Sequence, residues 1–147
     1  MSYFQKNRFF NHRGLASLEF TLIAALFFLL IFSIIGIART MYVYNATVNA
    51  TRLGARLAVV CSPSAVANIK AKMVARVPDL TAANINLAYN PSGCSVSTCT
   101  SVTASVSNFT VAIATPASFP LGSITIPGFS TTLVRESMDS TNNSVCS

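Results

Sequence analysis

An unbroken run of uncharged residues near the N-terminus constrains the fold of this chain more than any other feature. From Phe20 to Ala38 the sequence reads FTLIAALFFLLIFSIIGIA, which is 19 residues without a charge. About 20 helical residues, at roughly 1.5 Å each, span the hydrocarbon core of a bilayer. Thr21 and Ser33 can donate their hydroxyls to backbone carbonyls of such a helix. The run therefore predicts a single transmembrane helix, which we place at residues 15–39.

Basic residues flank the run on both sides. The N-terminal tail carries Lys6, Arg8 and Arg13, and Arg39, Arg52 and Arg56 follow the run. Because the positive charges on the two sides nearly balance, they do not fix the orientation of the helix. All four cysteines follow the run, and an even number of cysteines suits an oxidising compartment. We therefore expect the N-terminus in the cytoplasm and the C-terminal portion outside it.

The cysteines allow more than one arrangement. Cys94 and Cys99 bracket four residues in a polar loop and can close a small ring, which would leave Cys61 and Cys146 to pair with each other. Four cysteines permit three connectivities, and the sequence does not choose among them. A zinc site is the alternative, but the chain has no CxxC pair, and its one histidine, His12, precedes the apolar run.

Composition argues against several classes of protein. Charged residues make up 10% of the chain, against about 25% in an ordinary soluble domain. The net charge is +6, but the basic residues form no stripe or recognition-helix pattern, so we expect no nucleic-acid partner.

After the run there is no histidine, and the acids are Asp79, Glu136 and Asp139. On one strand Glu136 and Asp139 would point to opposite faces, so we expect neither an enzyme nor a cofactor.

Helical periodicity continues beyond the apolar run. Side chains at spacings of three and four predict a helical stalk over residues 40–60 that packs on its own domain; they are Met41, Tyr44, Val48, Arg52 and Ala55. The NATVNAT segment would form a polar strip beside them. A second helix is predicted in CSPSAVANIKAKMVARVP, with Ser62 as N-cap and Pro78 as its end. Its apolar face would be Val66, Ile69, Met73 and Val77.

The periodicity changes to two after Pro78, which indicates strands. Alternating apolar residues predict strands at Ile85–Tyr89, at Val102–Val106 and at Phe109–Ile113, the last two forming a hairpin or one bulged long strand. A short edge strand is expected at Ile124 and Ile126, and a last strand at Thr131–Met138. The prediction is an α+β head at residues 61–147, with one helix and an antiparallel sheet.

The stretch HRGLASLEF precedes the apolar run. A basic leader ends at Gly14, and Glu19 and Phe20 follow five and six residues later. This arrangement resembles the class III signal of type IV pilin-like proteins. The resemblance implies that a membrane aspartyl prepilin peptidase cuts between Gly14 and Leu15, removing residues 1–14 and keeping the apolar helix. It also implies that Glu19 meets the new α-amine of a neighbouring subunit and acts in register and assembly.

A longer segment carries a wider resemblance. The sequence from Arg13 to Ala58, with its LGARLA end, is similar to the TadE-like family of minor pilins and pseudopilins of the Tad/Flp tight-adherence system. LVRES at Leu133–Ser137 resembles the hydrophobic-R-x-E strand that often closes the extracytoplasmic domain of that family. The resemblance implies a pilin-like protein of the bacterial inner membrane. Its expected partners are the prepilin peptidase, other pilin or pseudopilin subunits and the Tad secretion machinery.

Two other interpretations compete with this one. The chain can remain an uncleaved single-pass protein whose head binds another envelope component. It can also be a secreted domain, freed from a signal peptide at the small residues VNA, Val48–Ala50. The apolar run exceeds the 7–15 residues of an ordinary signal core, which favours a retained helix. We therefore expect a membrane-anchored minor pilin or pseudopilin.

Overall fold

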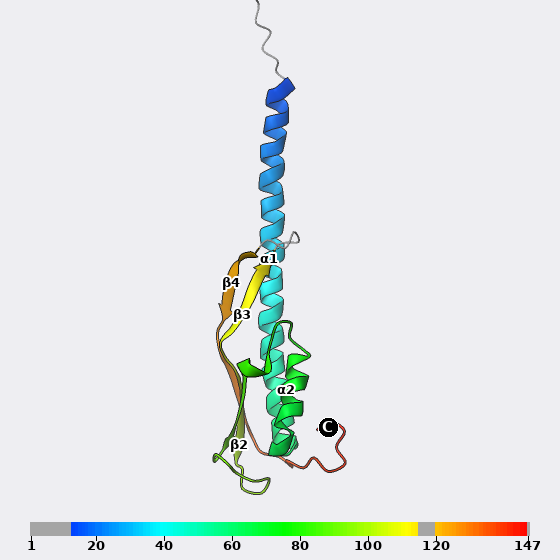
Figure 1. The fold of residues 1–147 in the computed structure, drawn as a ribbon, viewed down its shortest axis with the longest axis vertical. Coiled ribbons are helices and arrows are strands. Elements are labelled where there is room, and N and C mark those ends of the chain that lie inside the picture. The colour runs from blue at the N-terminus through cyan, green and yellow to red at the C-terminus, as the bar shows by residue number, and fades with distance from the viewer. Residues whose placement is uncertain (1–12, 115–119, 147) are drawn as a thin grey trace, which may run out of the picture. The chain divides into compact units, whose positions relative to one another are not determined.

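The computed structural model describes residues 13–114 and 120–146. It has two compact units, Met1–Ile35 and Gly36–Ser147, and helix α1 (Arg13–Val60) contributes to both. The second unit adds a short 3₁₀ turn η1 (Pro63–Ala65), helix α2 (Val66–Val74), a second 3₁₀ turn η2 (Ala82–Asn84) and strands β1–β5 (Figure 1). The predicted α+β class, a long apolar N-terminal helix followed by a short helix and antiparallel strands, is confirmed.

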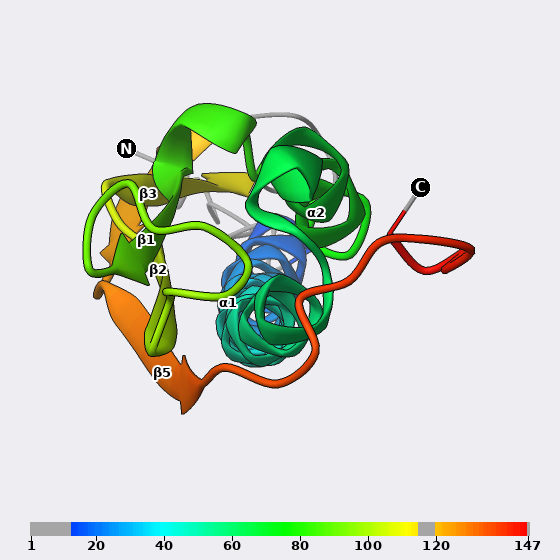
Figure 2. The same ribbon diagram turned by 90° about the horizontal axis from the view of Figure 1, so that it is seen from below.

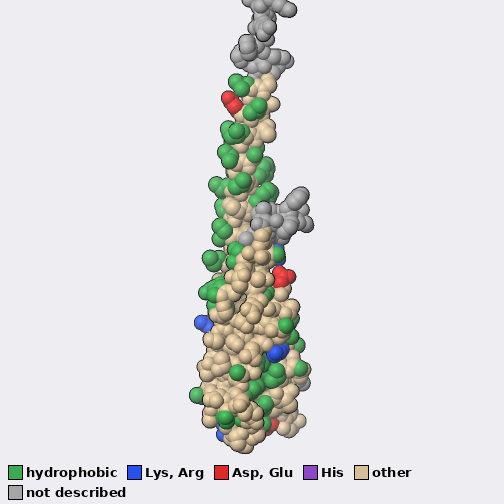
Figure 3. All heavy atoms as spheres, turned by 60° about the vertical axis from the view of Figure 1, so that its left-hand side comes forward, with side chains coloured by type: hydrophobic (Ala, Val, Ile, Leu, Met, Phe, Trp, Pro, Cys, Tyr) green, Lys and Arg blue, Asp and Glu red, His purple; other side chains and the backbone are tan. Residues whose placement is uncertain are grey.

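In the first unit, the large apolar side chains of α1 are exposed on every side of the helix. The most apolar window of 18 residues has a mean hydropathy of 2.8, and α1 is the one described helix long and apolar enough to cross a membrane. Figure 3 shows these side chains along the helix. As expected, Thr21 Oγ1 donates to the Ser17 carbonyl and Ser33 Oγ to the Leu30 carbonyl, each at 2.7 Å. A helix that is apolar all round suits lipid or a helix bundle, not water.

In the second unit, α1 is the central helix and buries a face of small side chains. The buried residues of this face are Val43, Thr47, Ala50, Thr51, Gly54, Ala55 and Ala58. The predicted stripe is therefore wrong in part, because Met41 is 58% exposed and Arg52 is exposed too. The polar strip is also misplaced, since Thr47 and Thr51 lie in the core. Their hydroxyls donate to the carbonyls four residues earlier, at 2.8 Å each, so no polar group is left unpaired.

The small face of α1 lets α2 approach closely. Ile69 and Met73 of α2 are fully buried, and a Cβ added at Gly54 would overlap the Met73 thioether. Figure 2 shows α2 beside α1, with most of the strands on the other side of α1. Ser62 occupies an N-cap position as predicted, but it precedes the 3₁₀ turn η1 rather than α2, and its side chain makes no capping bond. Its hydroxyl is instead 2.7 Å from Ser64 Oγ and 2.9 Å from Ser140 Oγ.

The strands form two antiparallel sheets. Strands β1 (Ile85–Asn90), β2 (Ser101–Val106) and β5 (Phe129–Val134) form one in the order β1-β2-β5, and β3 (Phe109–Ala114) pairs with β4 (Pro120–Ile126) in the other. The predicted alternation is confirmed, since Ile85, Val102, Ala104 and Val106 all face the core.

Of the two arrangements expected for β2 and β3, the hairpin is wrong, because each strand pairs with a different partner. The other, one long strand with an irregularity, is closer to the structure, since the register of the pairing continues from β2 to β3. The two strands are separated by Ser107 and Asn108, and Asn108 has a φ of 53° that interrupts the extended backbone. On the partner strands, Pro127 and Gly128 separate β4 from β5. This break lies opposite the break between β2 and β3, since Val106 pairs with Phe129 and Phe109 with Ile126. The edge strand expected at Ile124 and Ile126 is the longer β4. Part of the preceding connection, residues 115–119, lies outside the described residues.

The last strand ends at Val134, four residues before the predicted Met138. Beyond it, the backbone N–H groups of Glu136 and Met138 both donate to the Val59 carbonyl at the end of α1, at 3.1 and 3.3 Å. Met138 is fully buried and has a φ of 46°. The chain leaves the sheet here because these contacts direct it across the end of α1.

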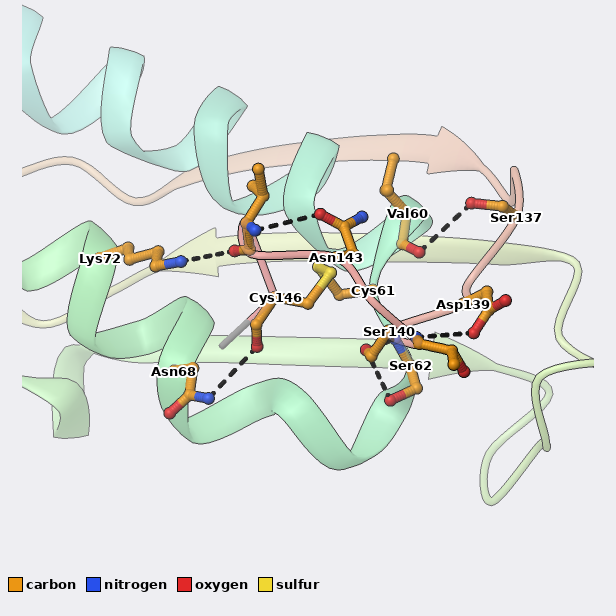
Figure 4. The surroundings of a disulfide bond; sticks show 12 residues. Val60, Cys61, Ser62, Asn68, Lys72, Ser137, Asp139, Ser140, Asn143 and Cys146 are labelled. Atoms are coloured by element: carbon orange, nitrogen blue, oxygen red, sulfur yellow. Dashed lines mark hydrogen bonds between the residues drawn. A yellow bond between two sulfur atoms is a disulfide. The ribbon is translucent and has the colours of Figure 1, made fainter.

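We call residues 137–146 the C-terminal clasp (Figure 4). A disulfide joins Cys146 to Cys61, and the Asn68 amide donates to the Cys146 carbonyl at 3.2 Å. The Ser62 N–H donates to Ser140 Oγ at 2.9 Å, and Lys72 donates to the Val145 carbonyl. Hydrogen bonds from Thr141 lower the pKa of Asp139 below its ordinary value. The clasp thus ties the C-terminal residues to the junction of α1 and α2.

The second disulfide closes the loop between β1 and β2. It joins Cys94 to Cys99, five residues apart. The Thr100 N–H donates to the Asn90 carbonyl at 2.8 Å, and the Arg135 guanidinium donates to the Val96 carbonyl of the loop. Of the three connectivities that four cysteines permit, the structure therefore has the one that pairs the two loop cysteines with each other.

Candidate processing and assembly site

Gly14 and Leu15 lie in the first turn of α1. Gly14 is exposed, and beyond its own turn of the helix no described atom lies within 4 Å of a Cβ built on it. The first N–H groups of a helix have no intrahelical partners, and this first turn has no acidic residue to stabilise it. The peptide bond between Gly14 and Leu15 can therefore be exposed by unwinding one weakly held turn. The rest of the expected leader, residues 1–12, lies outside the described residues.

Glu19 lies one helical turn beyond Leu15. Residues four apart share one face of a helix and are separated by about 6 Å along its axis. Glu19 is exposed and makes no hydrogen bond or ion pair with any residue that the structure describes. Its surroundings on the helix are apolar and exposed: Leu15, Leu18, Phe20, Leu22 and Ile23. A carboxylate costs up to about 2.5–3.5 kcal/mol when it enters the hydrocarbon of a bilayer, and this maximum applies at the centre. A positive partner would therefore stabilise Glu19 among these apolar side chains.

Phe20, the second residue expected to act in assembly, is 74% exposed. It follows Glu19 directly and so lies about a quarter turn away from it around the helix. Two aromatic contacts lie farther along the helix, where the ring of Phe28 is 6.0 Å from that of Phe27 and 6.2 Å from that of Phe32. The helix therefore presents a carboxylate bordered by large apolar side chains that are open to a neighbour.

Titratable groups elsewhere form no comparable arrangement among the described residues. No three His, Cys, Asp or Glu side chains gather there as metal ligands do. The Tyr89 hydroxyl is buried without a hydrogen-bond partner among the residues that the structure describes, and burial raises its pKa. Glu136 and Asp139 are both exposed and both lie beyond the end of β5, so neither is on a strand.

One feature of the second unit was missed by the sequence reasoning. Exposed polar residues recur along α1 at spacings of four, three and four: Asn45, Asn49, Arg52 and Arg56. An open groove of about 510 Å³ lies between this stripe and β5. We call it the arginine groove, and it is lined by Asn49, Arg52, Leu53, Arg56, Thr131 and Leu133. The spacing of the polar residues was visible in the sequence, but the groove also needs β5, whose position the sequence did not give.

The family expectation can now be compared with known proteins. Residues 14–56 match a family model described as TadE-like protein. The match begins at Gly14, includes Glu19 and lies within the segment that carried the resemblance, so the TadE-like assignment is confirmed for these residues. No curated protein and no solved structure matches the chain.

Proposed function

We propose that this chain is a membrane-anchored minor pilin or pseudopilin, processed after Gly14, that takes part in assembly of a Tad/Flp-type adhesion pilus. The observation that carries the proposal is the position of Glu19, one turn past Leu15 on an exposed apolar helix within the TadE-like segment. A TadE-like segment by itself supports an association with the Tad pilus. The spacing of Gly14 and Glu19 supports the more specific role.

The proposed mechanism joins two groups that are each costly in an apolar setting. Cleavage after Gly14 would create an α-amine on Leu15, and such amines have an ordinary pKa of about 8 and are mostly cationic at neutral pH. In an assembly of parallel helices, Glu19 of one subunit would accept hydrogen bonds from the Leu15 amine of the next. Each charge offsets the desolvation of the other, and removing either one leaves an unpaired charge. The pair would set the register between neighbouring helices.

The proposed topology places the N-terminus in the cytoplasm and the second unit outside the inner membrane. Both disulfides, Cys61–Cys146 and Cys94–Cys99, belong to the second unit. Disulfides persist in oxidising compartments, which supports this orientation. The peptidase would then cut on the cytoplasmic side, and the Tad machinery and neighbouring subunits are the proposed partners.

The first experiment measures the N-terminal mass of the protein recovered from its native membrane. We expect a chain that starts at Leu15, with or without a methyl group on its amine. Gly14→Val adds a β-branched side chain where nothing in the structure obstructs it, so it should block cleavage and leave the fold intact. Ala25→Val, on an exposed part of the same helix, is the matched control and should be processed normally.

Two other results would replace the proposal. An intact Met1 or Ser2 terminus in the wild-type protein would identify an uncleaved single-pass protein. A start near Thr51 would identify a secreted domain.

The second experiment separates processing from assembly. Glu19→Gln keeps the size of the side chain and removes its charge. We expect normal cleavage and a loss of at least about tenfold in the amount recovered with sheared pili, because an unpaired buried ammonium costs more than 1.4 kcal/mol. Glu136→Gln, at an exposed site in the second unit, is the control and should assemble normally. Equal assembly of Glu19→Gln and the wild type would exclude the proposed pair.

A further inference from the structure

The arginine groove and the hollow beside it contain arginine side chains that have no acidic partner among the described residues. Arg52 and Arg56 lie one turn apart on α1, and both are exposed. A second hollow adjoins the groove through Asn49 and Leu53 and adds Arg76, two residues beyond the end of α2. None of these three guanidinium groups makes a hydrogen bond or ion pair with a residue that the structure describes. The one ion pair among the described residues, between Arg39 and Asp79, uses none of them.

The other wall of the groove is a strand with a free edge. β5 pairs with β2 on one side and has no described strand on the other, and Figure 2 shows it at the outer edge of its sheet beside α1. Thr131 and Leu133 of β5 are half-buried and face the groove, whereas Ser130 and Thr132 are exposed on the other face. An edge strand presents unpaired N–H and C=O groups that can pair with an added strand.

The spacing of the arginines fits a strand that runs along the helix. Arg52 and Arg56 are separated by about 6 Å along the helix axis. Alternate residues of a β-strand lie on one face and about 6.6–6.8 Å apart. An added strand with acidic residues at alternate positions would thus bring one carboxylate to each guanidinium on the groove side. The residues between them would lie on the opposite face, beside the exposed Ser130 and Thr132.

Charge decides between a second copy of this chain and a different partner. The second unit, residues 36–147, carries seven Lys and Arg against three Asp and Glu, for a net charge of +4. One of the three acids, Asp79, already pairs with Arg39. Two such units therefore repel each other, and an acidic partner is attracted to both the groove and the whole unit.

From these observations we infer that the arginine groove binds an extended segment of another protein, with acidic residues at alternate positions, which adds to the free edge of β5. The carboxylates would pair with Arg52 and Arg56, and backbone hydrogen bonds to β5 would hold the strand. The inference goes beyond the proposed function and does not depend on cleavage after Gly14 or on Glu19.

The test uses the full-length protein in a non-ionic detergent and a fluorescent peptide of alternating glutamate and valine, Gly-(Glu-Val)₃-Gly. We expect saturable binding by fluorescence anisotropy that weakens as salt increases. Arg52→Gln/Arg56→Gln should weaken it by about tenfold, since two exposed ion pairs contribute up to about 1 kcal/mol each. The control Lys70→Gln/Lys72→Gln removes the same charge from α2, outside the groove, and should change binding less than about twofold.

Two further peptides test the strand. A Glu-Pro peptide keeps the charges but lacks half of the N–H donors, and it should bind far more weakly. Arg52→Glu/Arg56→Glu should lose the Glu-Val peptide and gain binding to Lys-Val, a gain that a misfolded variant cannot produce. The inference is overturned by no binding, by equal losses in the arginine and lysine variants, or by equal binding of the Glu-Pro peptide. It is also overturned if vesicles of phosphatidylglycerol, but not phosphatidylcholine, displace the peptide through the same arginines, because the occupant is then a lipid surface.

Discussion

Helix α1 exposes large apolar side chains in residues 15–35 and buries small ones in residues 43–58. In the first part, leucine, isoleucine and phenylalanine are mostly more than half exposed. In the second part, most buried side chains are threonine, alanine and glycine, and Val43 and Leu57 are the larger residues among them. The difference shows that exposure follows the surroundings of a helix rather than the size of its side chains. Lipid accepts large apolar groups, whereas a close helix contact requires small ones.

The largest effect is expected from the disulfide that closes the second unit. Cys61→Ser/Cys146→Ser opens a link across 85 residues, which in the chain-entropy model costs about 4.6 kcal/mol of unfolding free energy. Cys94→Ser/Cys99→Ser opens a link across five residues and should cost about 2 kcal/mol. Hydrogen exchange in detergent should show faster exchange in the second unit and unchanged protection in residues 15–35. Parallel changes in both regions would mean that α1 unfolds as one cooperative helix.

The next largest effect separates two glycines of the same helix. Gly54→Val forces a side chain against the fully buried Met73, and overpacking of this kind costs about 3 kcal/mol. Gly14→Val meets nothing and should leave the thermal unfolding of the second unit unchanged. Adding Met73→Ala to Gly54→Val should recover part of the loss, because it makes room for the new side chain. A double variant less stable than the sum of the two single changes would show that Met73 is not the obstacle.

A third pair of variants removes apolar atoms from the two regions. Val43 is 1% exposed and Leu26 is 61% exposed. Val43→Ala should lower the free energy of unfolding by about 2 kcal/mol, since it leaves a cavity in the core. Leu26→Ala removes more atoms but should leave the stability of the second unit unchanged in urea titrations. If Leu26→Ala proved as costly, residues 15–35 would have tertiary contacts absent from the structure.

The sequence predicted the first region better than the second. The 19 uncharged residues, and the spacing of Gly14 and Glu19, could be recognised without any knowledge of packing. The strands at Ile85 and Val102 were also recognisable, because each has one buried face and alternates accordingly. All of these features can be recognised from residues that are close together in the sequence.

The features that were mispredicted depend on contacts between distant residues. Thr47 and Thr51 were assigned to a polar strip because their hydroxyls are polar. Bonds to the preceding turn satisfy those hydroxyls, and their burial depends on the distant residues that cover this side of α1. The strand after Phe129 was extended too far because its end is set by the Val59 carbonyl, 77 residues before Glu136 in the chain. No local pattern reveals which side of α1 is buried or where β5 ends. The same holds for the arginine groove, whose two walls come from α1 and β5.

The smallest effect is expected at the ion pair that marks the end of the uncharged run. Arg39 is the first charged residue after Glu19, and its Nη2 lies 3.6 Å from Asp79 Oδ2, with both side chains about half exposed. Asp79 also has a φ of 65°, which aspartate, asparagine and glycine tolerate better than other residues. The ion pair and the backbone conformation of Asp79 therefore both affect stability, and three substitutions distinguish the two effects.

Asp79→Asn removes only the charge and should cost about 0.5 kcal/mol, an effect that vanishes in 1 M NaCl because the Debye length falls to about 3 Å. Asp79→Ala also places a Cβ without a polar group at positive φ and should cost about 1 kcal/mol more, independent of salt. Asp79→Gly loses the charge but relieves the backbone, so it should be at least as stable as Asp79→Asn. Denaturant midpoints at low and high salt measure all three. A salt-independent loss in Asp79→Asn would mean that the hydrogen-bonding capacity of the carboxylate, not its charge, holds the residues after α2 against α1.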